Sequence, residues 1–159
     1  MPSEALEDFG ITAMDEAAID ACLERNSTAV LGIPTQGPPY LLPLSYGYDG
    51  GDRLYFSFLE GDDSTKAGLV DGEVPVQALV LRVDSAVTWD SVQLTGTLSP
   101  VSESEREKAT ACMENAWRPA VLEQIEDDAA VSLYALEVSE RSGLRHTGLP
   151  AGFPGSENG

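Results

Sequence analysis

The sequence predicts a mainly β domain, a small barrel with flanking helices. Six short segments have strand-like patterning and are separated by turn residues. One of them, residues 75–84, is apolar on both faces, which argues against a single sheet with one face in water. Other segments have helical periodicity, and the length of 159 residues fits one domain. These observations together favour a barrel.

The N-terminal part is expected to hold the first helix. Residues 1–11 are expected to form a flexible lead. Thr12 is expected to cap the helix, with Asp15 three residues later as a capping-box partner. Asn26 is a plausible end of the helix. The apolar positions that share one helical face are Met14, Ala17, Ala18, Ala21 and Cys22.

Strand patterning then follows in segments 28–33, 40–48 and 53–59, and the last two are joined by a hairpin loop at 49–52. Pro43 has no amide hydrogen, so it predicts an edge, a bulge or a gap that faces a ligand. Within 40–48, one face is predicted to carry Tyr40, Leu42, Leu44, Tyr46 and Tyr48, and the other Leu41, Pro43, Ser45 and Gly47.

The second half is predicted to begin with a short helix over 65–71 that ends at Gly72. Strands are expected at 75–84 and 87–98, and Ser102 with Glu105 forms a capping box for a further helix. That helix presents Ala109, Cys112, Met113, Ala116 and Trp117 on one face. Pro119 either breaks it or begins a second helix that reaches about Glu126, and a last strand covers 131–138.

The domain is expected to span 12–146, followed by a disordered tail at 147–159 that is rich in Gly and Pro. His146 is the single histidine, and its place after the last predicted strand suggests a solvated side chain. With no second histidine and no CxxC, the sequence argues against a metal site. Cys22 and Cys112 are expected to be buried free thiols. No nucleophile elbow, dinucleotide-binding or Walker motif is present, and no catalytic residue is predicted.

Charge excludes two classes of partner. The chain has 27 Asp and Glu against 9 Lys and Arg, a formal net charge of −18, and such a surface repels nucleic acid and anionic lipid. Solubility is one interpretation of this acidity. Adaptation to high salt, as in a halophile, is favoured because the acids are spread along the chain. There is no run of about 18 apolar residues and no signal-like N-terminus, so a cytoplasmic location is expected.

A candidate binding motif stands at residues 64–66. Ser64, Thr65 and Lys66 open the predicted short helix, where unpaired amide hydrogens and the helix dipole favour an anion. Two hydroxyls and an ammonium group there could hold a phosphate. The alternative is a surface lysine that pairs with Asp62 or Asp63. The residues alone leave both interpretations open.

The segment PLSYGYDGGDRLYFSFLEGDDSTKAGLV resembles the core of the FMN-binding split-barrel family related to pyridoxamine 5′-phosphate oxidase. In that family a Pro-x-Ser strand pairs with a Leu-Tyr-Phe strand, and a loop with a hydroxyl residue and Lys leads into a short helix. WDSVQLTGTL is similar to a later strand of the family. The resemblance runs from about Met14 to Val138. It implies a six-stranded split barrel and a homodimer with FMN at the subunit interface.

The resemblance also implies roles for individual residues. Lys66, with Ser64 and Thr65, would hold the FMN phosphate, and Ser91 would make a polar contact to the flavin. Trp89 would cover the pocket from the partner subunit, unless it only packs. Serines on strands can instead face solvent. The remaining cofactor-binding positions are Leu42, Pro43, Leu44 and Ser45 beside the isoalloxazine ring, and Phe56 and Ser57 beside the ribityl chain and phosphate.

The sequence departs from pyridoxamine 5′-phosphate oxidases proper. These carry additional arginines and an Arg-x-His pair, whereas Arg145 and His146 are adjacent here. The chain is more similar to small relatives of the nitroimidazole-resistance type. A flavin-dependent oxidoreductase acting on an unidentified small molecule is therefore expected. The alternatives are a non-catalytic flavin-binding or storage protein, a relative that binds F420 or haem, and a structural dimer without a cofactor.

Overall fold

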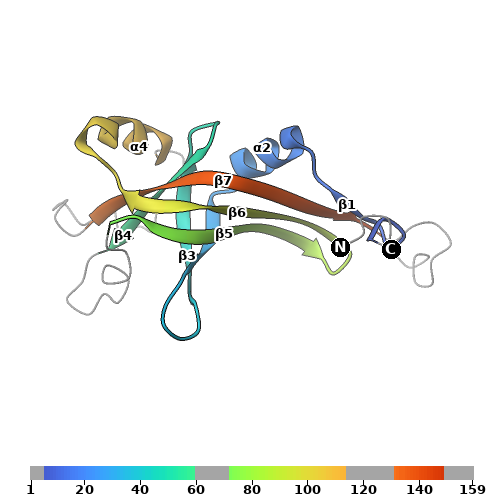
Figure 1. Cartoon of the computed structure of the whole chain (residues 1–159). Helices are drawn as coiled ribbons and strands as arrows, with labels where there is room; N and C mark the ends of the chain where they lie inside the picture. Colours follow the sequence, from blue (N-terminus) through green and yellow to red (C-terminus); the bar gives the residue numbers. More distant parts are fainter. Residues whose placement is uncertain (1–5, 60–71, 114–130, 149–159) are drawn as a thin grey trace.

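The computed structural model describes residues 6–59, 72–113 and 131–148, and the account below concerns these residues. It is mostly β, with two α-helices and a short 3-10 helix (Figure 1). In chain order the elements are β1 (Ile11–Ala13), α2 (Glu16–Arg25), β2 (Thr28–Ile33), β3 (Tyr40–Tyr48), β4 (Arg53–Leu59), β5 (Val74–Ser85), β6 (Thr88–Pro100), η1 (Glu103–Glu105), α4 (Arg106–Met113) and β7 (Val131–Thr147).

The sheet closes on itself. Its strand order is β1-β7-β4-β3-β2-β5-β6, and β6 also pairs with β7, so six antiparallel strands form a barrel with β1 added beside β7. This confirms the predicted six-stranded barrel. Beyond the barrel, β5, β6 and β7 continue as a long ribbon, and α2 lies over it (Figure 1).

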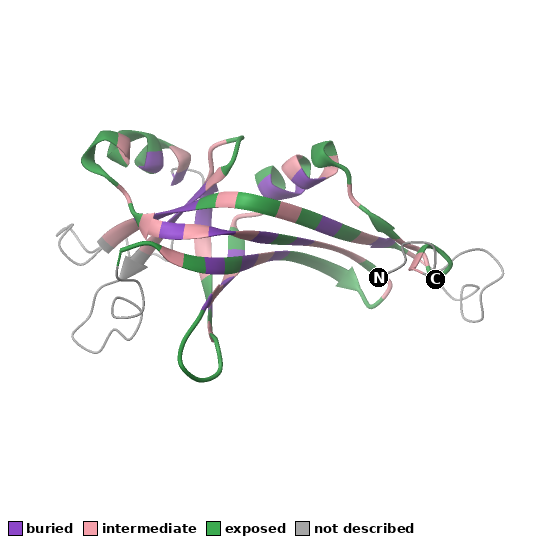
Figure 2. Ribbon diagram, in the orientation of Figure 1, coloured by how far each residue is buried: buried purple, intermediate pink, exposed green. Residues whose placement is uncertain are grey.

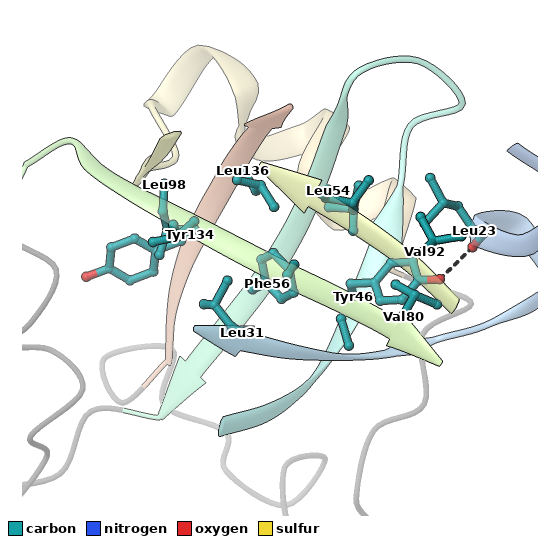
Figure 3. Close-up of a cluster of buried hydrophobic side chains, with 14 of the residues drawn as sticks. Leu23, Leu31, Tyr46, Leu54, Phe56, Val80, Val92, Leu98, Tyr134 and Leu136 are labelled. Atoms are coloured by element: carbon teal, nitrogen blue, oxygen red, sulfur yellow. Dashed lines mark hydrogen bonds between the residues drawn. The ribbon is translucent and has the colours of Figure 1, made fainter. Parts of the chain in front are cut away.

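The barrel interior is an apolar core. Tyr46 and Phe56 meet there with ring centroids 6.5 Å apart, and the Tyr46 hydroxyl donates to the Leu23 carbonyl at 2.7 Å, which ties α2 to β3 (Figure 3). The two faces predicted for β3 are confirmed. Leu42 and Tyr46 are buried, and the other large residues of that face pack against the core, namely Tyr40, Leu44 and Tyr48.

The start of α2 differs from the prediction. Asp15, not Thr12, is the N-cap, and its carboxylate accepts from the Ala18 amide at 2.8 Å. Thr12 belongs to β1, and Ile11, which was expected in the flexible lead, pairs with His146. An extended strand held by β7 therefore precedes the helix, and the cap falls where the chain leaves that strand. The helix ends at Asn26, as predicted.

The two-sided burial predicted for residues 75–84 is wrong. In β5 only the inner face is buried, through Val76, Ala78 and Val80. Leu81 and Val83 are 50% and 59% exposed, and this end of β5 is green in Figure 2. The described elements of this chain therefore leave these apolar outer residues of β5 largely uncovered.

The last strand is much longer than the predicted segment 131–138. β7 runs to Thr147 because β6 continues beside it, and the two form a ladder from Pro100↔Tyr134 to Thr88↔Thr147. Gly143 permits close packing instead of a turn, since a Cβ there would lie 2.7 Å from the Met14 sulfur. The predicted end of the last strand at residue 138 is therefore wrong, and residues 149–159 of the expected tail lie outside the described chain.

Helix α4 packs on the outside of the barrel, over Tyr55 and Ala135, through Ala109 and Met113. The predicted capping box is wrong. Ser102 makes no side-chain cap bond, and the Glu105 carboxylate pairs with Arg53 instead. The predicted positions Ala116, Trp117, Pro119 and Glu126, and the short helix 65–71, lie outside the described residues. Among the helices that are described, none is long and apolar enough to cross a membrane.

Candidate functional site

The barrel has a split between β3 and β4. Their ladder covers only Tyr46↔Phe56 to Tyr48↔Leu54, and beyond it the strands diverge. Residues 40–45 of β3 pair with β2, whereas residues 57–59 of β4 pair with β7. Within the described chain, residues 40–45 have a strand neighbour on one side only. We call this segment the β3 edge, and its outward backbone groups are available to a ligand.

Pro43 and two serines mark this split. Pro43 is exposed and pairs with Val30 of β2, so the edge that the missing amide hydrogen predicted is confirmed. Ser45 and Ser57 are the first residues beyond the Tyr46↔Phe56 pair, where β3 and β4 diverge. Both are half-buried. Each alternates with a core residue, so both serines lie on the outer face of the barrel.

Other predicted residues point inward. Leu42 and Phe56 are buried in the core, and Leu44 packs against it. Their side chains cannot line an external site. The Tyr46 amide donates to the Ser27 carbonyl on the β2 side, so by alternation the backbone groups of Leu42 and Leu44 also face β2, and those of Pro43 and Ser45 face the split. The predicted phosphate motif, Ser64 with Thr65 and Lys66, lies outside the described residues.

Trp89 and Ser91 lie on β6, which β2 and β5 separate from the β3 edge. Ser91 pairs with Leu81 on one side and Leu144 on the other, and Trp89 pairs with Val83 and His146. The single chain thus brings Ser45 and Ser57 together but does not bring Trp89 to them.

An apolar groove runs along the outside of the barrel over β2, β3 and β5. Its volume is about 520 Å³, within the range of ligand sites. Leu41, 64% exposed, belongs to the β3 edge and lines the groove, and Gly32, which has no side chain, lies opposite it on β2. We call this the outer groove, and its other principal apolar residues are Val30, Pro34, Pro39, Pro75 and Leu79.

The prediction that His146 is solvated is wrong. His146 is 7% exposed and lies within β7, opposite Trp89 on β6. Its Nε2 lies 2.8 Å from the Phe9 carbonyl oxygen, and its ring meets Trp89 edge-on, at 5.7 Å between centroids and 71° between planes. The glycines near His146 suggested a tail, and Leu144, two residues earlier on the same face of the strand, is 39% exposed, so local alternation does not signal this burial.

Arg145 takes part in a different contact from its neighbour His146. Its Nε donates to Asp90 at 2.7 Å, and Arg25 from α2 approaches the same carboxylate at 3.8 Å. Asp90 and Trp89 are successive strand residues and point to opposite faces, and so do their partners Arg145 and His146. The two side chains are not arranged to grip one phosphate, in accord with the departure from pyridoxamine 5′-phosphate oxidases proper.

Most described cations are already paired. Of the seven lysines and arginines in the described ranges, six lie within 4.0 Å of a carboxylate oxygen: Arg25, Arg53, Arg82, Lys108, Arg141 and Arg145. None of these pairs involves Ser45 or Ser57. The described part of the site therefore offers hydroxyl and backbone groups, and a phosphate there would need a cation from elsewhere in the chain.

Groups for acid–base, nucleophilic or metal chemistry are scarce. Burial raises the pKa of the Cys22 thiol, and burial followed by Asp49 raises that of Cys112, so both favour the unreactive thiol form. Cys22 is buried as predicted, whereas Cys112 is only partly covered. Across the described ranges, no group of three His, Cys, Asp or Glu side chains could hold a metal ion.

Several solved structures share this fold. A FAD-binding protein from Mesorhizobium loti has a TM-score of 0.67 at 18% identity, over 86% of this chain and 99% of that one. A FAD and heme binding protein from Mycobacterium smegmatis has a TM-score of 0.67 at 19% identity, over 89% and 75%. A candidate 5-nitroimidazole antibiotic resistance protein from Bacteroides thetaiotaomicron has a TM-score of 0.56 at 18% identity, over 85% and 88%.

The sequence itself carries the family assignment. No curated protein matches it. The family model described as pyridoxamine 5′-phosphate oxidase, however, matches residues 15–145, from the N-cap of α2 almost to the end of β7. The match covers all six strands that close the barrel. The chain therefore belongs to the pyridoxamine 5′-phosphate oxidase family.

Proposed function

We propose that the protein binds FMN along the β3 edge and acts, as a homodimer in the cytoplasm, as a flavin-dependent oxidoreductase. The observation that carries this proposal is the split of the barrel, where Ser45 and Ser57 flank a strand edge with free backbone groups. Family membership and the FAD-binding relatives support a flavin, and their names make FAD the first alternative to FMN.

The described residues fit a flat, polar-edged ring. The outer side of the β3 edge carries the small Ser45 and the rigid Pro43, and the outer groove beside it is mainly apolar. Ser45 and Ser57 would hydrogen-bond the polar groups of the flavin, and the outward backbone groups of Pro43 and Ser45 would orient it. Bound flavin would supply hydride and electron transfer, while these residues bind it and limit the access of water.

The phosphate would be held by Ser64, Thr65 and Lys66. Six of the seven described cations already contact carboxylates, so few positive charges remain for a ligand. Lys66 and Arg118 are the two cations outside the described residues. Lys66 follows β4, which reaches the split, and this position favours it as the phosphate ligand.

The homodimer is proposed from the exposed apolar outer face. Leu41, Leu81 and Val83 are at least half exposed, and the outer groove lies beside Leu41. A second copy that covers this face would remove apolar surface from water and would bring its own Trp89 to the flavin.

Light scattering checks the dimer. We expect the wild type to have twice the mass of the chain, and Leu81→Asp with Val83→Asp to give monomers. Ala111→Asp, on the exposed side of α4, is the matched control and should remain dimeric. A monomeric wild type would contradict the dimer.

Purification of the full chain tests the cofactor. We expect yellow protein with flavin absorption bands, and a released molecule with the mass of FMN. FAD, F420 or haem would each be recognised by mass and spectrum and would replace FMN in the proposal. A colourless protein that binds none of the four when they are added would overturn it.

Activity is tested separately. Reduction of the bound flavin by NADH or NADPH, followed by reoxidation with an added acceptor such as a nitroimidazole or a quinone, would support an oxidoreductase. Bound flavin that none of these reagents reduces or reoxidises would favour the storage alternative.

A further inference from the structure

The N-terminal segment 6–13, which we call the strap, closes over the end of the β6–β7 ribbon. Its β1 part pairs with β7 through Ile11↔His146 to Ala13↔Leu144 (Figure 1). The Thr147 amide donates to the Gly10 carbonyl at 3.3 Å. The Phe9 and Gly10 amides donate back to the Leu6 and Glu7 carbonyls, each at 3.0 Å. The strap is thus hydrogen-bonded both within itself and to β7.

Gly10 is the position at which the strap approaches most closely. Its φ is +84°, a left-handed conformation that favours glycine. A Cβ at Gly10 would lie 2.2 Å from the Gly148 carbonyl oxygen and 3.3 Å from Cδ2 of His146. Any larger residue must therefore push the strap away from β7 and from the His146 ring.

His146 is held between the strap and Trp89. The Phe9 carbonyl can only accept, so the Nε2 atom of His146 carries a hydrogen and donates to it at 2.8 Å. This bond fixes the plane of the imidazole ring, whose neighbour Trp89 packs against it edge-on at 5.7 Å. Loss of the Phe9 contact would leave the imidazole free to rotate.

Trp89 has cross-strand neighbours that differ in exposure. It is half-buried, and its cross-strand partner on β5, Val83, is 59% exposed. The partner on the other side is His146, which is buried. The buried neighbour of Trp89 is therefore His146, the residue that contacts the strap.

We propose that the strap acts through His146 to set the orientation of Trp89, which makes His146 a positioning residue. Its consequence for the cofactor rests on the proposed function, in which Trp89 covers the flavin of the second copy. The link from the strap to Trp89 stands on the contacts of one chain alone.

Fluorescence of Trp89 tests this link in the full chain without cofactor. The chain has two tryptophans, so a Trp117→Phe background leaves Trp89 as the single indole. Gly10→Ala and His146→Ala should each shift its emission to the red and increase quenching by acrylamide. Gly37→Ala is the matched control, since no atom lies within 4 Å of its Cβ, and it should change neither signal.

The double variant shows whether the strap and His146 act as one unit. Gly10→Ala with His146→Ala should change the Trp89 signals no more than the larger single change, because the two substitutions break the same path. Additive changes would overturn the proposal, and so would unchanged Trp89 signals in variants that keep their far-UV circular dichroism. If His146→Ala fails to fold, His146→Phe keeps a ring, removes the bond to Phe9, and decides the matter.

An FMN titration separates this inference from the proposed function. Gly10→Ala should weaken FMN binding about fivefold, as expected for roughly 1 kcal/mol, while Gly37→Ala should not. A wild type that binds no flavin would overturn the proposed function, and the fluorescence result would still decide the strap. If the wild type binds FMN tightly and Gly10→Ala binds it equally well, the proposed effect of the strap on cofactor binding would be overturned.

Discussion

Single cations carry unusual weight in this chain because carboxylates outnumber them three to one. Arg141 contacts Glu16 and Asp20, and Arg53 contacts Glu105 and Glu137. The side-chain hydrogen bond to Glu105 raises the pKa of the Arg53 guanidinium group, and those to Asp20 and Glu16 raise the pKa of Arg141, so both groups stay charged. Replacement of a lysine that binds the cofactor phosphate should therefore weaken cofactor binding more than replacement of a lysine that pairs with a carboxylate.

Lys66→Ala is expected to weaken FMN binding by about 2 kcal/mol, as for the loss of a charge-assisted bond to phosphate. Lys108→Ala is the matched control, because Lys108 is an exposed helical lysine whose Nζ lies 3.4 Å from Asp49. Titration with FMN, followed by flavin fluorescence, measures both. Equal small effects would contradict the phosphate assignment.

The candidate site was predictable where residue type and alternation agree. Pro43 predicted a strand edge, and the alternation of β3 predicted that the Ser45 hydroxyl points outward. Both residues lie at the split. Phe56 was expected beside the cofactor, but its side chain is in the core because it alternates along β4 with Tyr55 and Ser57, which face outward. The burial of His146 depends on a contact with Phe9, more than a hundred residues earlier in the chain, and no local pattern reveals such a contact.

At the scale of elements, a particularly close contact helps to fasten each described α-helix to the sheet. For α4 it is at Gly47 of β3, where a Cβ would lie 2.4 Å from the Cys112 carbonyl oxygen and 2.8 Å from the Met113 amide nitrogen. For α2 it is Arg141 of β7, which reaches Asp20 at 2.7 Å, while the Tyr48 hydroxyl donates to the same carboxylate.

Gly47→Ala is expected to destabilise the fold by about 1–3 kcal/mol, because the methyl group would meet backbone atoms that cannot rotate away. Chemical denaturation followed by circular dichroism measures the free energy of unfolding. Gly37→Ala in the exposed β2–β3 loop serves as the control. A Gly47→Ala protein as stable as the wild type would show that α4 shifts freely over the sheet.

Arg141→Gln should lower the melting temperature most above about pH 5. The hydrogen bond from Arg141, followed by that from Tyr48, lowers the pKa of Asp20 below its ordinary 3.8. The stabilisation is therefore complete above 3.8 and is lost as the pH falls through the lower folded value. Thermal melts across this range should show the gap between variant and wild type shrinking in acid.

Arg82→Gln is the control for this experiment. Arg82 pairs at 3.6 Å with Asp84, and both side chains are about half exposed, so its loss should change the melting temperature little at any pH. A gap for Arg141→Gln that stays constant down to the acid limit would contradict the role given to Asp20.

Most strands were predictable because one face of each meets the core and alternation records that contact. β2, β3 and β4 begin and end at the predicted residues. The end of β7 was not predictable, since its partner β6 lies in another part of the sequence and stabilises a segment that contains Gly143. The N-cap of α2 moved from Thr12 to Asp15 for the same reason, as β1 takes Thr12 into the sheet.

At the scale of the whole molecule, like charges surround one barrel. A net charge of −18 favours unfolding through self-repulsion, and salt relieves it by shortening the screening length from about 10 Å at 0.1 M to about 3 Å at 1 M. The eight described ion pairs involve only seven of the 27 acids.

Molar sodium chloride is therefore expected to raise the melting temperature by several degrees, since about 1 kcal/mol shifts it by roughly 2–4 °C at this size. Thermal melts of the flavin-free chain between low and molar salt measure the shift. The same melting temperature in both would contradict adaptation to high salt.

The position of β7 in the barrel has a consequence for synthesis. It pairs with β1, β4 and β6, so it supplies both the closing seam and the partner of the strap. Until the ribosome has released residues 131–147, β4 and β6 each have one edge without a partner strand, and these edges can pair with other chains. Stalled nascent chains that end before residue 131 should therefore be degraded readily by protease, whereas release of the complete β7 should make the barrel resistant.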